Sequence, residues 1–175
     1  MGETQQVTED ALKQQVRERL SADFEIHEEV EGWSIVEQCA VRIDFMLHPR
    51  LHLIEQGFDL AWFGCEVKAP SGNEPHKKGM WLLWQAITYA QSSFAPLCDR
   101  PAFVVIYPDL HQFFPENKRL AAVNLQAFAQ RGSVGRLLLD DDSWSIRFGS
   151  QRYFSSNRGR GKVKNLGLKR NVGTH

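Results

Sequence analysis

Hydrophobic and polar residues alternate along two stretches in the first third of the chain, and a period of two predicts strands. Phe24–Val30 alternates and is followed by Gly32, where we expect the strand to end. Val41–Leu47 alternates more regularly and is followed by His48-Pro49. One face of this second stretch is predicted to be apolar, and it consists of Val41, Ile43, Phe45 and Leu47.

A third strand is predicted over Leu60–Lys68, LAWFGCEVK, because the stretch is short and apolar and runs into Ala69-Pro70-Ser71-Gly72. Side chains alternate across a strand, so Glu66 and Lys68 would share the face opposite to the odd-numbered residues. Two buried charges are costly to desolvate unless they are paired or bind a metal. A salt bridge at a strand end is the simplest interpretation, and a catalytic pair is the alternative.

The spacing of apolar residues predicts three helices. The first covers Thr8–Leu20, with Thr8 as its N-cap, and the second covers about Lys77–Ser93. The third covers Lys118–Gln130, and its inward face is predicted to contain Leu120, Val123, Ala127 and Phe128.

The predicted order is helix, three strands, helix and strand, with the apolar run Ala102–Tyr107 as the fourth strand. A helix and a β-hairpin (about 117–154) follow it. This order predicts an α/β fold with a mixed central sheet flanked by helices. We expect one domain over residues 1–154, with its core at about 8–107, and a flexible basic tail over residues 155–175.

Composition and charge narrow the function classes. At 175 residues, with 42% hydrophobic and 24% charged residues, the chain is typical of a soluble globular domain. It has neither a signal-peptide pattern nor a membrane-spanning run, and its three cysteines are scattered, so we expect a cytoplasmic protein without membrane partners. Seven of the 21 Lys and Arg residues follow residue 150 without any acid, so the first 150 residues hold 14 bases and 21 acids. This split favours a polyanionic partner for the tail.

Three charged residues are predicted to meet at one edge of the sheet. Asp44 lies near the end of the second strand, and Glu66 and Lys68 lie near the end of the third. Two carboxylates placed together raise each other's pKa unless a divalent cation lies between them, and oxygen ligands favour Mg²⁺ or Mn²⁺. A nearby lysine can position a water or stabilise charge on a phosphate.

Ile43-Asp44 followed by Glu66-Val67-Lys68, on consecutive strands between two helices, resembles the PD-(D/E)XK nuclease superfamily. The resemblance spans roughly residues 8–107. It implies a restriction-endonuclease-like αβββαβ core and Mg²⁺-dependent DNA cleavage, for which we expect Mn²⁺ to substitute. It also implies metal ligation by Asp44, Glu66 and the Val67 carbonyl, with Lys68 as the catalytic lysine. Ile43 replaces the proline of the motif.

Gln85 and Tyr89 on the second predicted helix are similar to the Q-x-x-x-Y motif of the RecB-like and lambda-exonuclease-like branch. An i,i+4 pair lies on one helical face. The resemblance implies that both residues line the catalytic site, whereas the simpler interpretation makes Tyr89 a core aromatic. Members with an iron–sulfur cluster need four cysteines, so no cluster is expected here.

Many members of this superfamily add an upstream carboxylate, and the sequence leaves that choice open. Glu29, followed by Val30, is our preferred further metal ligand, because this order matches strand-borne acids in related nucleases. The alternatives are Glu9, Glu18 and Glu28.

Basic residues interleaved with Gly and Asn near the C-terminus can follow a phosphate backbone. Tyr153 and Phe154 are expected to stack on bases if the strands are parted. The residues predicted to bind nucleic acid are Arg158, Arg160, Lys162, Lys164, Lys169 and Arg170.

We therefore expect a metal-dependent DNA nuclease that hydrolyses phosphodiester bonds in DNA processing, repair or recombination. The alternative is a catalytically inactive nuclease-fold module that binds DNA or a protein partner. Exo- or endonuclease action, the preferred DNA structure and the oligomeric state, including a homo-oligomer or a larger DNA-processing complex, stay open.

Overall fold

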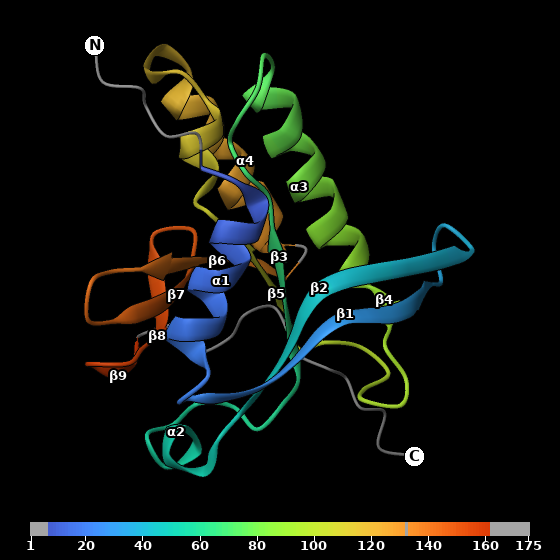
Figure 1. Cartoon of the computed structure of the whole chain (residues 1–175), viewed down its shortest axis with the longest axis vertical. Helices are drawn as coiled ribbons and strands as arrows, with labels where there is room; N and C mark the ends of the chain where they lie inside the picture. Colours follow the sequence, from blue (N-terminus) through green and yellow to red (C-terminus); the bar gives the residue numbers. More distant parts are fainter. Residues whose placement is uncertain (1–6, 132, 162–175) are drawn as a thin grey trace.

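The computed structural model describes residues 7–131 and 133–161. In this part the chain forms one mixed sheet with helices on both faces (Figure 1). The helices are α1 (Glu9–Leu20), α2 (Leu51–Glu55), α3 (Pro75–Tyr89) and α4 (Arg119–Arg131), with short 3₁₀ turns η1 (Leu110–Phe113) and η2 (Glu116–Lys118). The strands are β1 (Phe24–Ser34), β2 (Cys39–Pro49), β3 (Phe63–Val67), β4 (Ser92–Ser93), β5 (Val104–Tyr107), β6 (Val134–Leu139), β7 (Trp144–Phe148), β8 (Gln151–Ser155) and β9 (Gly159–Arg160).

The strand order across the sheet is β4-β1-β2-β3-β5-β6-β7-β8-β9. β3, β5 and β6 are parallel, because α3 and α4 carry the chain back between them, and all other neighbours are antiparallel. The predicted mixed α/β fold and its order of helices and strands are confirmed. α2, β4, β8 and β9 are additions to it.

Two hydrophobic clusters cover the two faces of the sheet. α1 packs through Leu12, Val16 and Leu20 onto one face, where β3 contributes Phe63, Cys65 and Val67. α3 and α4 cover the other face, over Val104 and Ile106 of β5 (Figure 1). Glu66 alternates with Cys65 and Val67 and therefore faces the α3 side, as its parity predicts.

β1 does not end at Gly32, as the sequence suggests, but continues to Ser34. The glycine allows a close approach, since a Cβ at position 32 would lie 2.5 Å from the Ser93 carbonyl oxygen and 2.6 Å from a Phe94 ring carbon. The missing side chain thus lets β4 and Phe94 pack against β1.

The predicted single apolar face of β2 is wrong in part. Phe45 and Leu47 pack in the α1 cluster, but Ile43 packs on the α3 side together with Met46. The change of face occurs at Asp44, opposite Glu29, whose backbone is left-handed with φ of 51°. This irregularity interrupts the alternation on which the prediction rested.

The predicted inward face of α4 is also wrong. Ala122 and Ala129 are buried, whereas Leu120, Val123 and Phe128 are 73%, 56% and 65% exposed. The helix lies close to the sheet through these small residues and through the partly buried Leu125, and its other large apolar side chains are exposed.

The prediction of a flexible tail is wrong for residues 155–161. β9 pairs with β8, and Arg160 forms an ion pair with Asp59 at 2.9 Å. Tyr153 and Phe154 are fully buried, so they cannot stack on bases as expected. Residues 162–175 of the predicted tail lie outside the described residues. No helix in the described part is long and apolar enough to span a membrane.

Candidate active site

Asp44 and Glu66 meet where β2 and β3 separate. Phe45 pairs with Cys65, so the next position along this register puts Asp44 opposite Glu66. The Val67 amide donates to Asp44 Oδ2 at 2.8 Å, and the Asp44 amide donates to Glu66 Oε2 at 3.3 Å. Each carboxylate therefore accepts a hydrogen bond from the backbone of the opposite strand.

Both carboxylates are buried, and this determines their electrostatics. Glu66 is 4% exposed and Asp44 is 9% exposed. Burial, followed by the negative charge of Asp44, raises the pKa of Glu66 to about 8. Burial also raises the pKa of Asp44, against the hydrogen bonds that it accepts from Lys13 and Val67. A pair of buried acids with raised pKa values is typical of a catalytic or metal-binding site.

Lys13 on α1 supplies a cation to this pair. Its Nζ lies 2.5 Å from Asp44 Oδ1 and 2.9 Å from Glu29 Oε1. Burial lowers the pKa of Lys13, but the bonds to Asp44 and Glu29 outweigh it and raise that pKa above its usual value. Glu29 thus reaches the site through Lys13, and it also pairs with Arg42 at 3.0 Å.

Lys68 is held by another residue of α1. Its Nζ lies 3.2 Å from Glu9 Oε2, so Glu9 is the upstream acid that contacts the predicted catalytic lysine. The other two alternatives lie elsewhere: Glu28 pairs with Arg17 at 2.7 Å, and Glu18 accepts from Gln14 at 2.7 Å.

Gln85 and Tyr89 lie one turn apart on α3, as predicted, and Gln85 Nε2 lies 3.1 Å from the Tyr89 hydroxyl. Burial, followed by the charge of Glu66, raises the pKa of Tyr89 to about 12, and its ring packs in the core edge-on to Phe94. Gln85 Oε1 is buried without a hydrogen-bond partner among the described residues. A buried acceptor without a partner is costly, and a water or a ligand donor would satisfy it.

Sequence reasoning missed Lys13. The available signal was its i,i+4 spacing from Glu9, which places both side chains on one side of α1 next to the buried Leu12. The i,i+4 spacing does not predict which strands α1 packs against, so the contact between Lys13 and Asp44 could be seen only in the structure.

Comparisons with protein-family models, with curated proteins and with solved structures found no match for this chain. Arguments about its function therefore depend on its own residues.

The chemistry of this site suits a divalent cation in one respect and opposes it in another. Asp44 and Glu66 place buried carboxylate oxygens side by side, but the ammonium of Lys13 already lies on Asp44 and competes with a metal for it. Mg²⁺ keeps most of its waters and commonly binds through one or two carboxylates. In the described part of the chain no three His, Cys, Asp or Glu side chains gather as a metal cluster, and the ligand set implied by the resemblance (Asp44, Glu66 and the Val67 carbonyl) contains two acidic side chains.

Of the six residues predicted to bind nucleic acid, two are described. Arg158 is exposed, whereas Arg160 bonds Asp59 and the Gly57 carbonyl and lies over the Tyr153 ring. Lys162, Lys164, Lys169 and Arg170 lie outside the described residues.

Proposed function

We propose that this protein is a metal-dependent DNA nuclease with a restriction-endonuclease-like core, which hydrolyses phosphodiester bonds in DNA processing, repair or recombination. The observation that carries the proposal is the buried pair of Asp44 and Glu66, each bonded to the backbone of the other's strand. Burial raises the pKa of both carboxyl groups and that of Glu66 to about 8, and a pair of perturbed acids of this kind favours a functional role.

The proposal assigns roles to the two acids themselves, to Lys68 with Glu9, and to Gln85 with Tyr89. Asp44 and Glu66 would hold Mg²⁺ or Mn²⁺, and a bound divalent cation would supply Lewis-acid chemistry towards water and phosphate oxygens. Lys68, oriented by Glu9, donates to the water or to a non-bridging phosphate oxygen. Gln85 uses its free Oε1 to accept from substrate or water, and its amide supports Tyr89 at the edge of the site.

The test is cleavage of linear, nicked, branched and single-stranded DNA with Mg²⁺ or Mn²⁺. We expect Asp44→Asn and Glu66→Gln, which preserve shape, to reduce the rate by at least about 100-fold, because each removes a charge needed in the transition state. The matched control is Glu55→Gln on α2, since Glu55 is exposed. Equal rates for Glu66→Gln and the parent would refute the proposal.

One observation favours the second candidate, a nuclease-fold module that binds DNA or protein without cleaving it. The ammonium of Lys13 already neutralises Asp44, as it would in a site that binds no metal. Calorimetric titration with Mn²⁺ separates the two candidates. A nuclease should bind Mn²⁺ in the parent and lose this binding in Glu66→Gln, whereas an inactive module should show no carboxylate-dependent binding in either protein.

A further inference from the structure

Three arginines stand opposite one another on three neighbouring strands. Arg136 on β6 pairs with Arg147 on β7, and Arg147 pairs with Arg152 on β8. Directly opposed side chains in a sheet have Cβ atoms about 5 Å apart, where like charges destabilise the pair. Three guanidinium groups in one cross-strand row therefore need compensation.

The row shares a face of the sheet with the candidate active site. Ile146 and Phe148, which flank Arg147 in β7, both pack in the cluster against α1. Arg136 and Arg152 pair directly with Arg147, so they share its face. The arginines therefore face the α3 and α4 side, as Glu66 does.

The same row continues to Glu66. Glu66 pairs with Ile106 on β5, and Ile106 pairs with Arg136. With strands about 4.8 Å apart, Arg136 lies about 10 Å from Glu66 and Arg152 about 19 Å from it, measured between backbones.

Most of this positive charge has no acidic partner within residues 7–131 and 133–161. Arg136 is matched by Asp109, which its Nη1 contacts at 2.5 Å, and its Nη2 donates to the Gly149 carbonyl at 3.1 Å. Among the described residues, Arg147 and Arg152 form no ion pair. The Nε atoms of all three arginines are buried without a hydrogen-bond acceptor.

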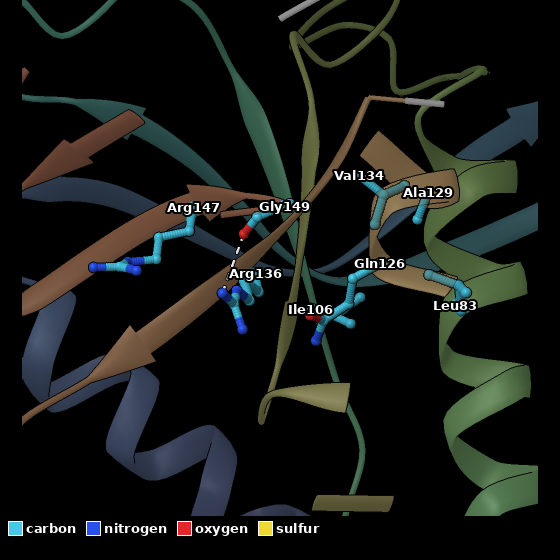
Figure 2. A pocket seen from close by; sticks show the side chains of 9 residues that line it. Leu83, Ile106, Gln126, Ala129, Val134, Arg136, Arg147 and Gly149 are labelled. Atoms are coloured by element: carbon cyan, nitrogen blue, oxygen red, sulfur yellow. Dashed lines mark hydrogen bonds between the residues drawn. The ribbon is translucent and has the colours of Figure 1, made fainter. Parts of the chain in front are cut away.

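The neighbouring pocket does not explain the row. Figure 2 shows the residues that line a small pocket, with Arg136 bonded to Gly149 and the Arg147 side chain directed away from Leu83 and Ala129. This cavity holds about 10 Å³, close to the volume that one water needs. A ligand of the arginines must therefore contact them from their solvent side, where the side chain of Arg136 is 20% exposed.

We propose that Arg147 and Arg152, next to Arg136, form a site for the phosphodiester backbone of DNA. Guanidinium groups present paired N–H donors that match phosphate oxygens, and an anion on their exposed Nη atoms would relieve the like-charge repulsion. This inference rests on the proposed nuclease function and adds a contact surface that the basic tail does not provide.

The experiment measures the binding of fluorescent duplex DNA by anisotropy, in EDTA to prevent cleavage, from about 50 to about 200 mM salt. For the double variant R147Q/R152Q we expect affinity to fall by at least about tenfold at the lower salt concentration. The slope of log K against log salt should become less steep by about two, since two phosphate contacts are lost.

The control is R50Q/R119Q, which removes the same charge from two exposed arginines outside the row. It should change affinity by less than about threefold, because charges beyond a Debye length are screened. R147K/R152K keeps the charge without the paired donors and should bind with intermediate affinity.

A thermal melt at low salt tests for a merely structural role. R147Q/R152Q should melt no lower than the parent, because the substitutions relieve like-charge contacts. A lower melting temperature with unchanged DNA affinity would overturn the proposal. So would a result in which pyrophosphate stabilises the parent but not the variant while both bind DNA equally, because the row would then be a site for a free anion.

The two proposals fail separately. If R147Q/R152Q loses DNA affinity but the parent cleaves no DNA, the proposed DNA contact of the arginine row is supported and the proposed nuclease activity is refuted. If the variant binds DNA with the parent's affinity and salt slope, the row is refuted, and metal-dependent cleavage by the parent is unaffected.

Discussion

At the scale of single residues, Asp44 and Glu66 are joined through the backbones of two neighbouring strands, whereas Lys13 and Glu9 reach the site from α1. Asp44 and Glu66 could be paired from strand parity and strand order, because both are properties of neighbouring strands. Lys13 and Glu9 could not be placed, because their contacts with Asp44 and Lys68 depend on how α1 lies across the sheet.

The raised pKa of Glu66 predicts how stability depends on pH without metal. The folded protein keeps the Glu66 proton up to about pH 8, whereas an unperturbed glutamate loses it near 4.5. The contribution of Glu66 to the free energy of unfolding is therefore fully present below about pH 4.5 and is lost as pH rises to about 8.

Urea unfolding in EDTA across this pH range measures the effect. We expect Glu66→Gln to flatten the decline in stability, while Glu55→Gln on the surface leaves it unchanged. Parallel pH profiles for Glu66→Gln and the parent would show that Glu66 ionises normally in the fold.

At the scale of elements, periodicity located α4 but assigned its wrong face. The large residues Leu120, Val123 and Phe128 recur at helical spacing, and such a stripe usually marks the buried side. Here Ala122 and Ala129 make the close contact, which periodicity alone cannot distinguish. A similar limit applied to β2, where the irregular backbone opposite Asp44 moved Ile43 to the other cluster.

Two phenylalanine truncations test the assignment of the α4 face. Phe113→Ala in η1 should lower the free energy of unfolding by about 3–5 kcal/mol, because Phe113 is fully buried. Phe128→Ala should change it by less than about 0.5 kcal/mol, because Phe128 is 65% exposed. Urea unfolding of both variants compares them directly, and a large loss for Phe128→Ala would contradict the orientation of α4.

At the scale of the whole molecule, the order of helices and strands could be predicted because each of these elements has its own local period. The C-terminal strands could not, since β8 is held by a shared aromatic cluster with Phe58 and β9 by the pair of Arg160 and Asp59. Such long-range contacts have no signature in local sequence. The opposite charges of the body and the C-terminal region were visible in the sequence.

A chain ending at Gly161 tests the rest of the predicted basic tail. It lacks Lys162, Lys164, Lys169 and Arg170, and if these four contact phosphates, the salt slope of DNA binding should become less steep by about three to four. Mn²⁺ affinity at Asp44 and Glu66 should not change. An unchanged salt slope would refute the prediction that this segment binds DNA.

The two hydrogen bonds that join Asp44 and Glu66 to the backbone have a spectroscopic consequence. The amide protons of Asp44 and Val67 point at carboxylate oxygens rather than at carbonyls. Their resonances in a ¹⁵N-labelled sample should therefore shift whenever Glu66 gains a proton or Asp44 exchanges the ammonium of Lys13 for another cation. The polypeptide thus carries its own pair of probes, through which the charge state of the site can be followed without a substrate or an attached label.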